Sequence, residues 1–246
     1  MIPKIIHYCW LSDSPIPDTL LRYMESWKKV LPKYEFVHWN FEMFPKGKSQ
    51  WVDEAFDNRK YAFAADYIRL YAIYNYGGIY LDMDVEVLKP FDFFLQYNTM
   101  LCFENSKDSR LEVAAFGAEK GAEWIGACLD YYENRHFVNA DGSFNTKVLP
   151  AVIRDCLKES GFVINPITSP DYIKNYSNKK IPVLPYDYFS PKSYATGKIE
   201  KTENTYSVHH FAGTWLPWYC RLEKKVCSML GISYRDFLHR HFASNK

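Results

Sequence analysis

The sequence predicts an α/β fold with a Rossmann-like, mostly parallel central sheet flanked by helices. The chain begins with an apolar strand pattern at residues 4–10, a helical pattern at 19–31 and a second strand pattern at 35–39. This order of strand, helix and strand is typical of parallel sheets. A later apolar strand at 79–81 is followed directly by two aspartates. Because such sheets bind ligands beyond the carboxyl ends of their strands, the pattern also places a ligand site there.

The helices in the first part of the chain have recognisable start and stop signals. Asp18 is a good N-cap for the first helix, and Pro32 ends it. Residues 55–76 are predicted to form a second helix, which Gly77 and Gly78 terminate. Glycine suits that position because a helix C-terminus often needs the left-handed backbone conformation.

The second half of the chain is predicted to be less regular. Residues 162–210 are rich in loops and proline, and we expect this segment to lie over the active site. No repeat or linker divides the chain, which predicts a single domain over 1–246. The other predicted elements are strands at 99–103 and 113–116, helices at 123–134, 146–158 and 219–230, and a short helix after residue 233.

Composition and charge narrow the classes of function. The 246 residues include 30 basic and 29 acidic side chains, for a net charge of +1. A nucleic-acid partner would require a strongly basic face, so none is expected. Aromatic residues make up 18% of the chain. Flat rings suit sugar faces and nucleotide bases, although they suit an apolar core equally well.

The sequence predicts a cytoplasmic location. Its six cysteines include no Cys-x-x-Cys pair, and most lie in apolar patterns, as reduced thiols do. The N-terminus has no signal-peptide pattern, and no apolar run reaches the length of a membrane span. The basic and aromatic residues after position 218 fit a peripheral contact with the inner face of the cell membrane. They fit a solvated helix face as well, and we favour the latter.

Asp82 and Asp84 give the sharpest chemical signal. A strand places residues i and i+2 on one side, so the two carboxylates of Asp82-Met83-Asp84 are expected to hold one divalent cation. Mn²⁺ and Mg²⁺ prefer oxygen ligands and are often shared with substrate phosphates. A nucleotide-sugar has a diphosphate leaving group, whose charge such an ion neutralises. On spacing alone, two solvated strand-end acids explain the motif as well.

Asp66 and Arg69 are the only charged residues in the helical segment 61–76. They stand three residues apart and therefore share a face, in surroundings so apolar that the helix is expected to be buried nearly all round. A simple ion pair is one interpretation. The functional one is that Asp66 accepts hydrogen bonds from sugar hydroxyls while Arg69 orients it or contacts the diphosphate.

Three other classes of protein were compared with the motif. A calcium loop that began at Asp82 would need Gly and Glu where the chain has Val87 and Phe93. Phosphatases with an aspartyl nucleophile share the strand-Asp-x-Asp pattern, but they have Thr or Val where this chain has Glu86. No P-loop or Gly-x-Gly-x-x-Gly pattern is present.

Six segments together resemble glycosyltransferase family 32, the group described by a sugar-binding region containing a DXD motif. Many of its bacterial members synthesise capsular or exopolysaccharides. The resemblance runs from residue 2 to about 218. The segments are 2–10 (IPKIIHYCW), 26–29 (SWKK), 66–71 (DYIRLY), 76–85 (YGGIYLDMDV), 116–121 (FGAEKG) and 209–215 (HHFAGTW).

The resemblance implies a fold of the GT-A type, a Mn²⁺ or Mg²⁺ ion, and hexose transfer with retention of configuration. A UDP-sugar is the preferred donor, and GDP-mannose is the other one considered. The expected acceptor is a glycan or a polyprenyl-diphosphate-linked oligosaccharide in surface polysaccharide synthesis. The single catalytic domain would have a nucleotide-sugar half at 1–100, an acceptor half with a closing loop at 101–218, and C-terminal helices at 219–246.

The resemblance also assigns roles to residues. Trp10 matches a tryptophan that stacks on the base, with core packing as an equal alternative. Asp66 and Arg69 match a donor-binding pair, Asp82 an aspartate that contacts ribose and sugar, and Asp84 the direct metal ligand.

The segment 209–215 and three earlier residues also receive expected roles. His210 is expected to bind the metal or a phosphate, whereas His209 is not; Thr214 and Trp215 are expected to contact the diphosphate. Glu104 and Asn105 are placed loosely near the acceptor or sugar. His7 is expected in the core. Two alternatives to the transferase function are an Asp-dependent phosphatase and a non-catalytic protein that binds sugar-nucleotides or glycans.

Overall fold

The central sheet has five strands and confirms the predicted α/β class. The structure is a computed structural model that describes residues 1–107, 109–175, 179–214, 222–223 and 226–227. Four of the five strands run in one direction: three neighbouring strands pair in parallel, and the strand that follows them across the sheet is antiparallel to both of its neighbours. The order across the sheet is β2 (Glu35–Trp39), β1 (Ile5–Cys9), β3 (Gly78–Leu81), β6 (Ala115–Ala118) and β5 (Thr99–Met100).

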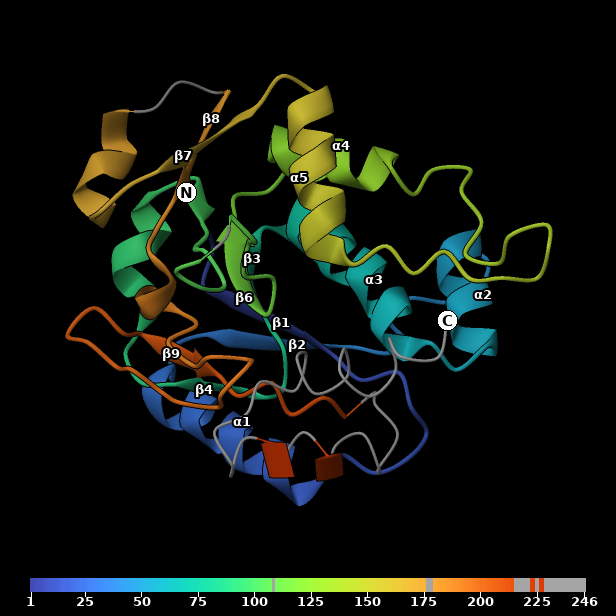
Figure 1. Cartoon of the computed structure of the whole chain (residues 1–246), viewed down its shortest axis with the longest axis horizontal. Helices are drawn as coiled ribbons and strands as arrows, with labels where there is room; N and C mark the ends of the chain where they lie inside the picture. Colours follow the sequence, from blue (N-terminus) through green and yellow to red (C-terminus); the bar gives the residue numbers. More distant parts are fainter. Residues whose placement is uncertain (108, 176–178, 215–221, 224–225, 228–246) are drawn as a thin grey trace.

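Two hydrophobic clusters cover the two faces of this sheet. Successive strand residues point to opposite faces. Accordingly, Tyr80 packs into one cluster, while Ile79 and Leu81 pack into the other. The first cluster lies under the helices α2 (Gln50–Asp57), α3 (Tyr61–Tyr76), α4 (Glu123–Asp130) and α5 (Leu149–Glu159), and the second lies beside α1 (Asp18–Val30) (Figure 1).

The helix predicted over residues 55–76 is in fact two helices. Its N-terminal part belongs to α2, and α3 begins at Tyr61. Arg59 adopts a positive φ of 57°, and the backbone N–H of Lys60 donates to the carbonyl of Ala55 at 2.8 Å. This left-handed C-terminal cap ends α2, although no glycine signals it. In contrast, Gly77 ends α3 as predicted, with a φ of 68°.

Segment 162–210 contains three strands that the sequence did not predict. β7 (Val163–Pro166) pairs in parallel with β8 (Lys180–Val183). β9 (Ser207–His209) pairs antiparallel with β4 (Val85–Val87), directly after the aspartate motif. The described part of this segment also has two short 3-10 helices, at Pro170–Asn175 and Tyr186–Tyr188, and another lies earlier in the chain, at Phe91–Gln96.

The β4–β9 pair joins two segments that are far apart in sequence, and it lies next to α1 (Figure 1). It brings residues 207–209 to the edge of the sheet where β3 ends. The helices predicted at 219–230 and after 233 fall almost entirely outside the described residues. Within those residues, no helix is long and apolar enough to cross a membrane.

Candidate active site

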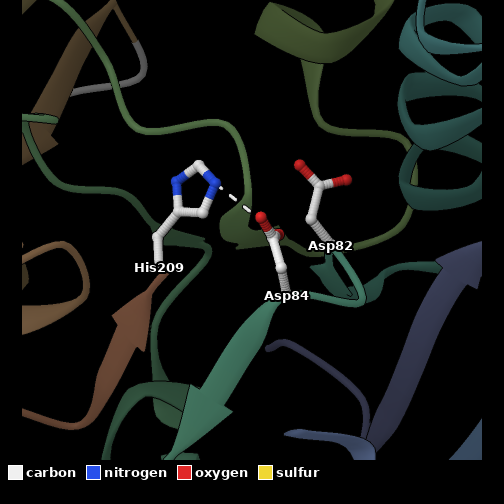
Figure 2. A group of neighbouring side chains, drawn as sticks. All are labelled: Asp82, Asp84 and His209. Atoms are coloured by element: carbon white, nitrogen blue, oxygen red, sulfur yellow. Dashed lines mark ion pairs between the residues drawn. The ribbon is translucent and has the colours of Figure 1, made fainter. Parts of the chain in front are cut away.

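The two motif aspartates lie in a turn between β3 and β4. The backbone N–H of Val85 donates to the carbonyl of Asp82 at 3.0 Å, which closes this turn. The N–H of Asp82 donates to the carbonyl of Ala114 at 2.8 Å. The side chains therefore approach each other because the chain reverses here, and not through strand alternation as the sequence predicted. Figure 2 shows Asp82, Asp84 and His209 facing one another.

The third member of this group is His209, whereas the sequence analysis expected His210 in this place. The donor atoms of Asp82, Asp84 and His209 all lie within 4.8 Å of one another. Nε2 of His209 lies 3.6 Å from Oδ1 of Asp84. His210 is turned away: its Nε2 lies 3.0 Å from Glu86, and its ring stacks on Tyr23 at 4.2 Å. The difference follows from β9, because neighbouring strand residues point to opposite sides.

The backbone after β9 also holds Asp84. The N–H of His210 donates to the carbonyl of Asp84 at 2.9 Å, and the N–H of Ala212 donates to its Oδ2 at 2.7 Å. Between them, Phe211 has a positive φ of 52°. This conformation costs energy in a non-glycine residue and is often found at functional sites. The ammonium of Lys192 donates to the carbonyl of His210 at 2.8 Å, which anchors a cation beside the site.

Arg69 connects the buried helix α3 to the motif. Its Nη2 lies 3.3 Å from Asp66 and 3.3 Å from Oδ1 of Asp82, and its Nη1 lies 3.4 Å from Oδ2 of Asp82. Nη1 also donates to the carbonyl of Val113 at 2.8 Å, and the guanidinium lies over the ring of Tyr80. The simple Asp66–Arg69 ion pair is therefore only one part of a network in which Arg69 bridges two carboxylates.

Burial sets the electrostatics of these groups. Loss of solvent raises the pKa of Asp66 to about 7, against the opposing charge of Arg69. Burial likewise raises the pKa of Asp82, and Arg69 opposes that shift. For His209 burial lowers the pKa, but the carboxylates of Glu112 and Asp84 outweigh it and raise the pKa to about 9. The carboxylates thus favour a positive charge at this position.

The donor set suits a divalent cation. Within the described residues, four carboxylates surround the guanidinium of Arg69 and the imidazole of His209. The carboxylates are those of Asp66, Asp82, Asp84 and Glu112. Concentrated negative charge at low exposure is unfavourable without a counter-charge. Carboxylate oxygens are the ligands that Mn²⁺ and Mg²⁺ prefer. Asp84 and His209 each retain only 13% side-chain exposure, so the donors are partly desolvated.

Sequence reasoning missed Glu112 and Lys192 and ranked His209 below His210. Glu112 is 1% exposed, and its Oε2 lies 3.1 Å from Nδ1 of His209. A signal existed for Glu112, because a single acid within an apolar stretch needs a buried partner. No comparable pattern singled out Lys192, whose position depends on the path of the loop before β9.

The remaining predicted residues are less closely tied to this group. Trp10 follows β1 at the edge of the sheet where Asp82 lies, and its Nε1 donates to the carbonyl of Ser14 at 2.8 Å. Thr214 is exposed, whereas Trp215 lies outside the described residues. Glu104 forms an ion pair with Arg110.

His7 lies in the core, as expected. It is 1% exposed. Its Nε2 is 2.8 Å from the carbonyl of Gly77, and its Nδ1 accepts a hydrogen bond from Nε1 of Trp39 at 3.1 Å. Both ring nitrogens are therefore used within the fold.

Comparison with known proteins indicates a glycosyltransferase. Residues 17–105 match the family described as "Glycosyltransferase sugar-binding region containing DXD motif". Inositol phosphoceramide mannosyltransferase 3 of Schizosaccharomyces pombe is 36% identical over 100 residues, which are 39% of this chain and 28% of that protein. Mannosyl phosphorylinositol ceramide synthase SUR1 of Saccharomyces cerevisiae is 34% identical over 88 residues, 34% of this chain and 23% of that protein.

A third relative matches a longer segment. Glucan organizing enzyme 1 of Cryptococcus neoformans var. grubii is 52% identical over 135 residues, which are 45% of this chain and 36% of that protein. In each case the match covers little more than a third of the relative's length, or less. Among solved structures, the PaToxG glycosyltransferase aligns over 65% of this chain and 70% of its own, with 20% identity and a TM-score of 0.49.

Proposed function

We propose that the chain transfers a hexose from a nucleotide-sugar to an acceptor hydroxyl, with a divalent cation held at Asp82, Asp84 and His209. The match of residues 17–105 to the glycosyltransferase family whose sugar-binding region contains a DXD motif supports this proposal. The observation that carries this proposal is that the two motif carboxylates lie beside the imidazole of His209, which comes from a segment more than a hundred residues later in the chain. When bound, Mn²⁺ or Mg²⁺ would supply Lewis-acid neutralisation of the leaving diphosphate.

The chain's own groups would position the donor. Asp84 is fixed by the N–H of Ala212, so that its other oxygen faces His209. Asp82 is fixed by Arg69, and Asp66 lies on the other side of the same guanidinium. Carboxylates held in this way accept hydrogen bonds from sugar hydroxyls in a defined direction. Positioning and electrostatic stabilisation would then supply most of the catalytic effect.

Lys192 and Arg69 would complement the negative charge of the diphosphate. The ammonium of Lys192 donates to the carbonyl of His210, whose own N–H donates to the carbonyl of Asp84, so this cation lies beside the motif. We infer retention of configuration, with the acceptor hydroxyl attacking on the face from which the leaving group departs. Its proton would pass to an oxygen of the departing diphosphate, so that no separate protein base is required.

The relatives guide the choice of donor and acceptor. One of them is named as an inositol phosphoceramide mannosyltransferase and another as a mannosyl phosphorylinositol ceramide synthase. We therefore place GDP-mannose first among donors, ahead of the UDP-sugars favoured on sequence, and a hydroxyl-bearing glycan or lipid headgroup as the acceptor. A role in capsular polysaccharide synthesis and a cytoplasmic location stay predictions.

A donor panel tests this proposal. Purified protein would be incubated with Mn²⁺ and, in turn, GDP-mannose, UDP-glucose, UDP-galactose and UDP-N-acetylglucosamine, and nucleotide release would be measured with and without EDTA. Slow hydrolysis of the donor serves as the readout when the acceptor is unknown. We expect release from one donor, abolished by EDTA and by Asp84→Asn. Full activity of Asp84→Asn at limiting Mn²⁺ would reject the assignment.

The same panel separates the two rival functions. A phosphatase would release phosphate from small phosphoesters without any sugar transfer. A non-catalytic binding protein would show a Mn²⁺-dependent thermal shift with a nucleotide-sugar but no release of nucleotide.

A further inference from the structure

The short segment before β6 contacts the site at three points. The carbonyl of Val113 accepts a hydrogen bond from Arg69, and the carbonyl of Ala114 accepts one from the backbone of Asp82, each at 2.8 Å. The third contact comes from the side chain of the preceding residue, Glu112. Residues 112–114 thus contact groups from α3, the motif turn and β9, two through backbone carbonyls and one through a side chain.

Glu112 is a buried carboxylate with both oxygens engaged. Only 1% of the residue is exposed. Its Oε1 accepts the backbone N–H of Ala114 at 2.7 Å, and its Oε2 lies 3.1 Å from Nδ1 of His209. The neighbouring side chains of Leu111 and Cys102 are fully buried and apolar. A charge in such surroundings is costly unless it is paired and hydrogen-bonded, so its position needs a partner, and His209 is that partner.

We propose that Glu112 is a positioning residue for the metal ligand His209, an inference that rests on the proposed function. Glu112 accepts the Nδ1–H of the imidazole and thereby directs the lone pair of Nε2 toward Asp84 and the cation. A neutral imidazole has one donor and one acceptor nitrogen, so fixing the first fixes the second. Histidines that bind metals commonly donate their other N–H to a carboxylate in this way.

A glutamine at this position would separate positioning from packing. Glu112→Gln keeps the shape of the side chain but has one acceptor oxygen and one NH₂ group. If the oxygen stays on the N–H of Ala114, the NH₂ group faces Nδ1 of His209. Nδ1 must then accept, and the imidazole proton moves to Nε2, where it points toward Asp84. A role limited to filling space would be insensitive to this exchange.

Mn²⁺ binding measures the effect without any need for activity. The EPR signal of free Mn²⁺ would be followed during titration of wild type, Glu112→Gln, His209→Ala and the double variant. We expect Glu112→Gln to weaken Mn²⁺ binding by roughly 10- to 100-fold. In the His209→Ala background the same substitution should add no further loss, because Glu112 acts through His209. Glu119→Gln, an acid at the other end of β6 that pairs with the N-terminus, serves as the matched control.

Each outcome decides a specific point. Two results would overturn the role of Glu112 and leave the ion site standing. One is wild-type Mn²⁺ affinity in a folded Glu112→Gln protein, and the other is an equal loss of Mn²⁺ affinity with and without His209. A wild-type protein that binds no Mn²⁺ rejects the ion site and this role together. Folding is checked by the melting temperature in EDTA. Should Glu112→Gln fail to fold, Glu112→Asp gives the same comparison, since it keeps the charge but withdraws it from His209.

Discussion

Arg69 and Asp82 face each other in a two-point contact, with Nη2–Oδ1 and Nη1–Oδ2 distances of 3.3 and 3.4 Å. The guanidinium also contacts Asp66, and its side chain is only 7% exposed. Two parallel contacts fix the plane of a carboxylate as well as its distance. The helix α3 therefore determines how the first motif aspartate is presented to a ligand.

Replacement of Arg69 by lysine tests this relationship. Lysine keeps the charge but cannot contact Asp66, Asp82 and the Val113 carbonyl together. We expect Arg69→Lys to lower kcat/KM for the donor by roughly 100-fold, as small misplacements of positioning groups do. Steady-state nucleotide release checks it. Arg154→Lys, which alters an exposed arginine on α5 paired with Asp155, is the matched control and should retain wild-type kcat/KM.

His209, the last residue of β9, and His210, which follows it, provide an internal comparison. His209→Ala removes a group from the ion site and should weaken Mn²⁺ binding by at least roughly tenfold. His210→Ala removes a ring that stacks on Tyr23 and contacts Glu86, so its Mn²⁺ affinity should stay near that of wild type. Isothermal titration with Mn²⁺ measures both. The opposite ranking would restore the assignment made from the sequence.

Lys192 is expected to act on the donor and not on the ion. Its ammonium donates to the carbonyl of His210, the residue whose N–H donates to the carbonyl of Asp84. Lys192→Met removes one cation from the diphosphate, so the KM for the donor should rise by roughly tenfold, the effect of a charge-assisted contact. Mn²⁺ affinity should be unchanged or slightly higher. An unchanged KM would contradict this role, and Lys198→Met, at an exposed lysine paired with Glu200, is the control.

His7 should make stability depend on pH. Burial lowers its pKa from 6.5 to about 4, although the carbonyl of Gly77 opposes the shift. The folded state thus prefers the neutral ring. The contribution of the neutral His7 ring to the free energy of unfolding is fully present above pH 6.5 and is lost as the pH falls toward 4. From pH 7 to 4.5 this loss amounts to about 2 kcal/mol.

Urea unfolding of wild type and His7→Asn at the two pH values checks this prediction. Asparagine does not titrate, so the free energy of unfolding of the variant should fall less on acidification, even though its stability at pH 7 is lower. If both proteins lose the same amount of stability between pH 7 and 4.5, His7 is not the group responsible.

Much of the first half of the chain could be predicted from the sequence. The strands at 5–9, 35–39 and 78–81 are apolar runs with clear boundaries, and the glycine at position 77 ends α3 as expected. The cap at Arg59 escaped prediction because a positive φ outside glycine leaves no sequence signal. Strands β7, β8 and β9 escaped because runs of three or four residues among prolines and loops show too little periodicity.

The sequence by itself determined the fold class, the two aspartates after a buried strand, and the charged pair on α3. These are local properties, since apolar periodicity and the spacing of charges are visible over a few residues. Only the tertiary structure decided that His209 and not its neighbour joins the aspartates, and that Glu112 stands behind it. Pairing of β9 with β4 across more than a hundred residues sets which histidine faces inward, because a shift of one residue exchanges the two sides of a strand.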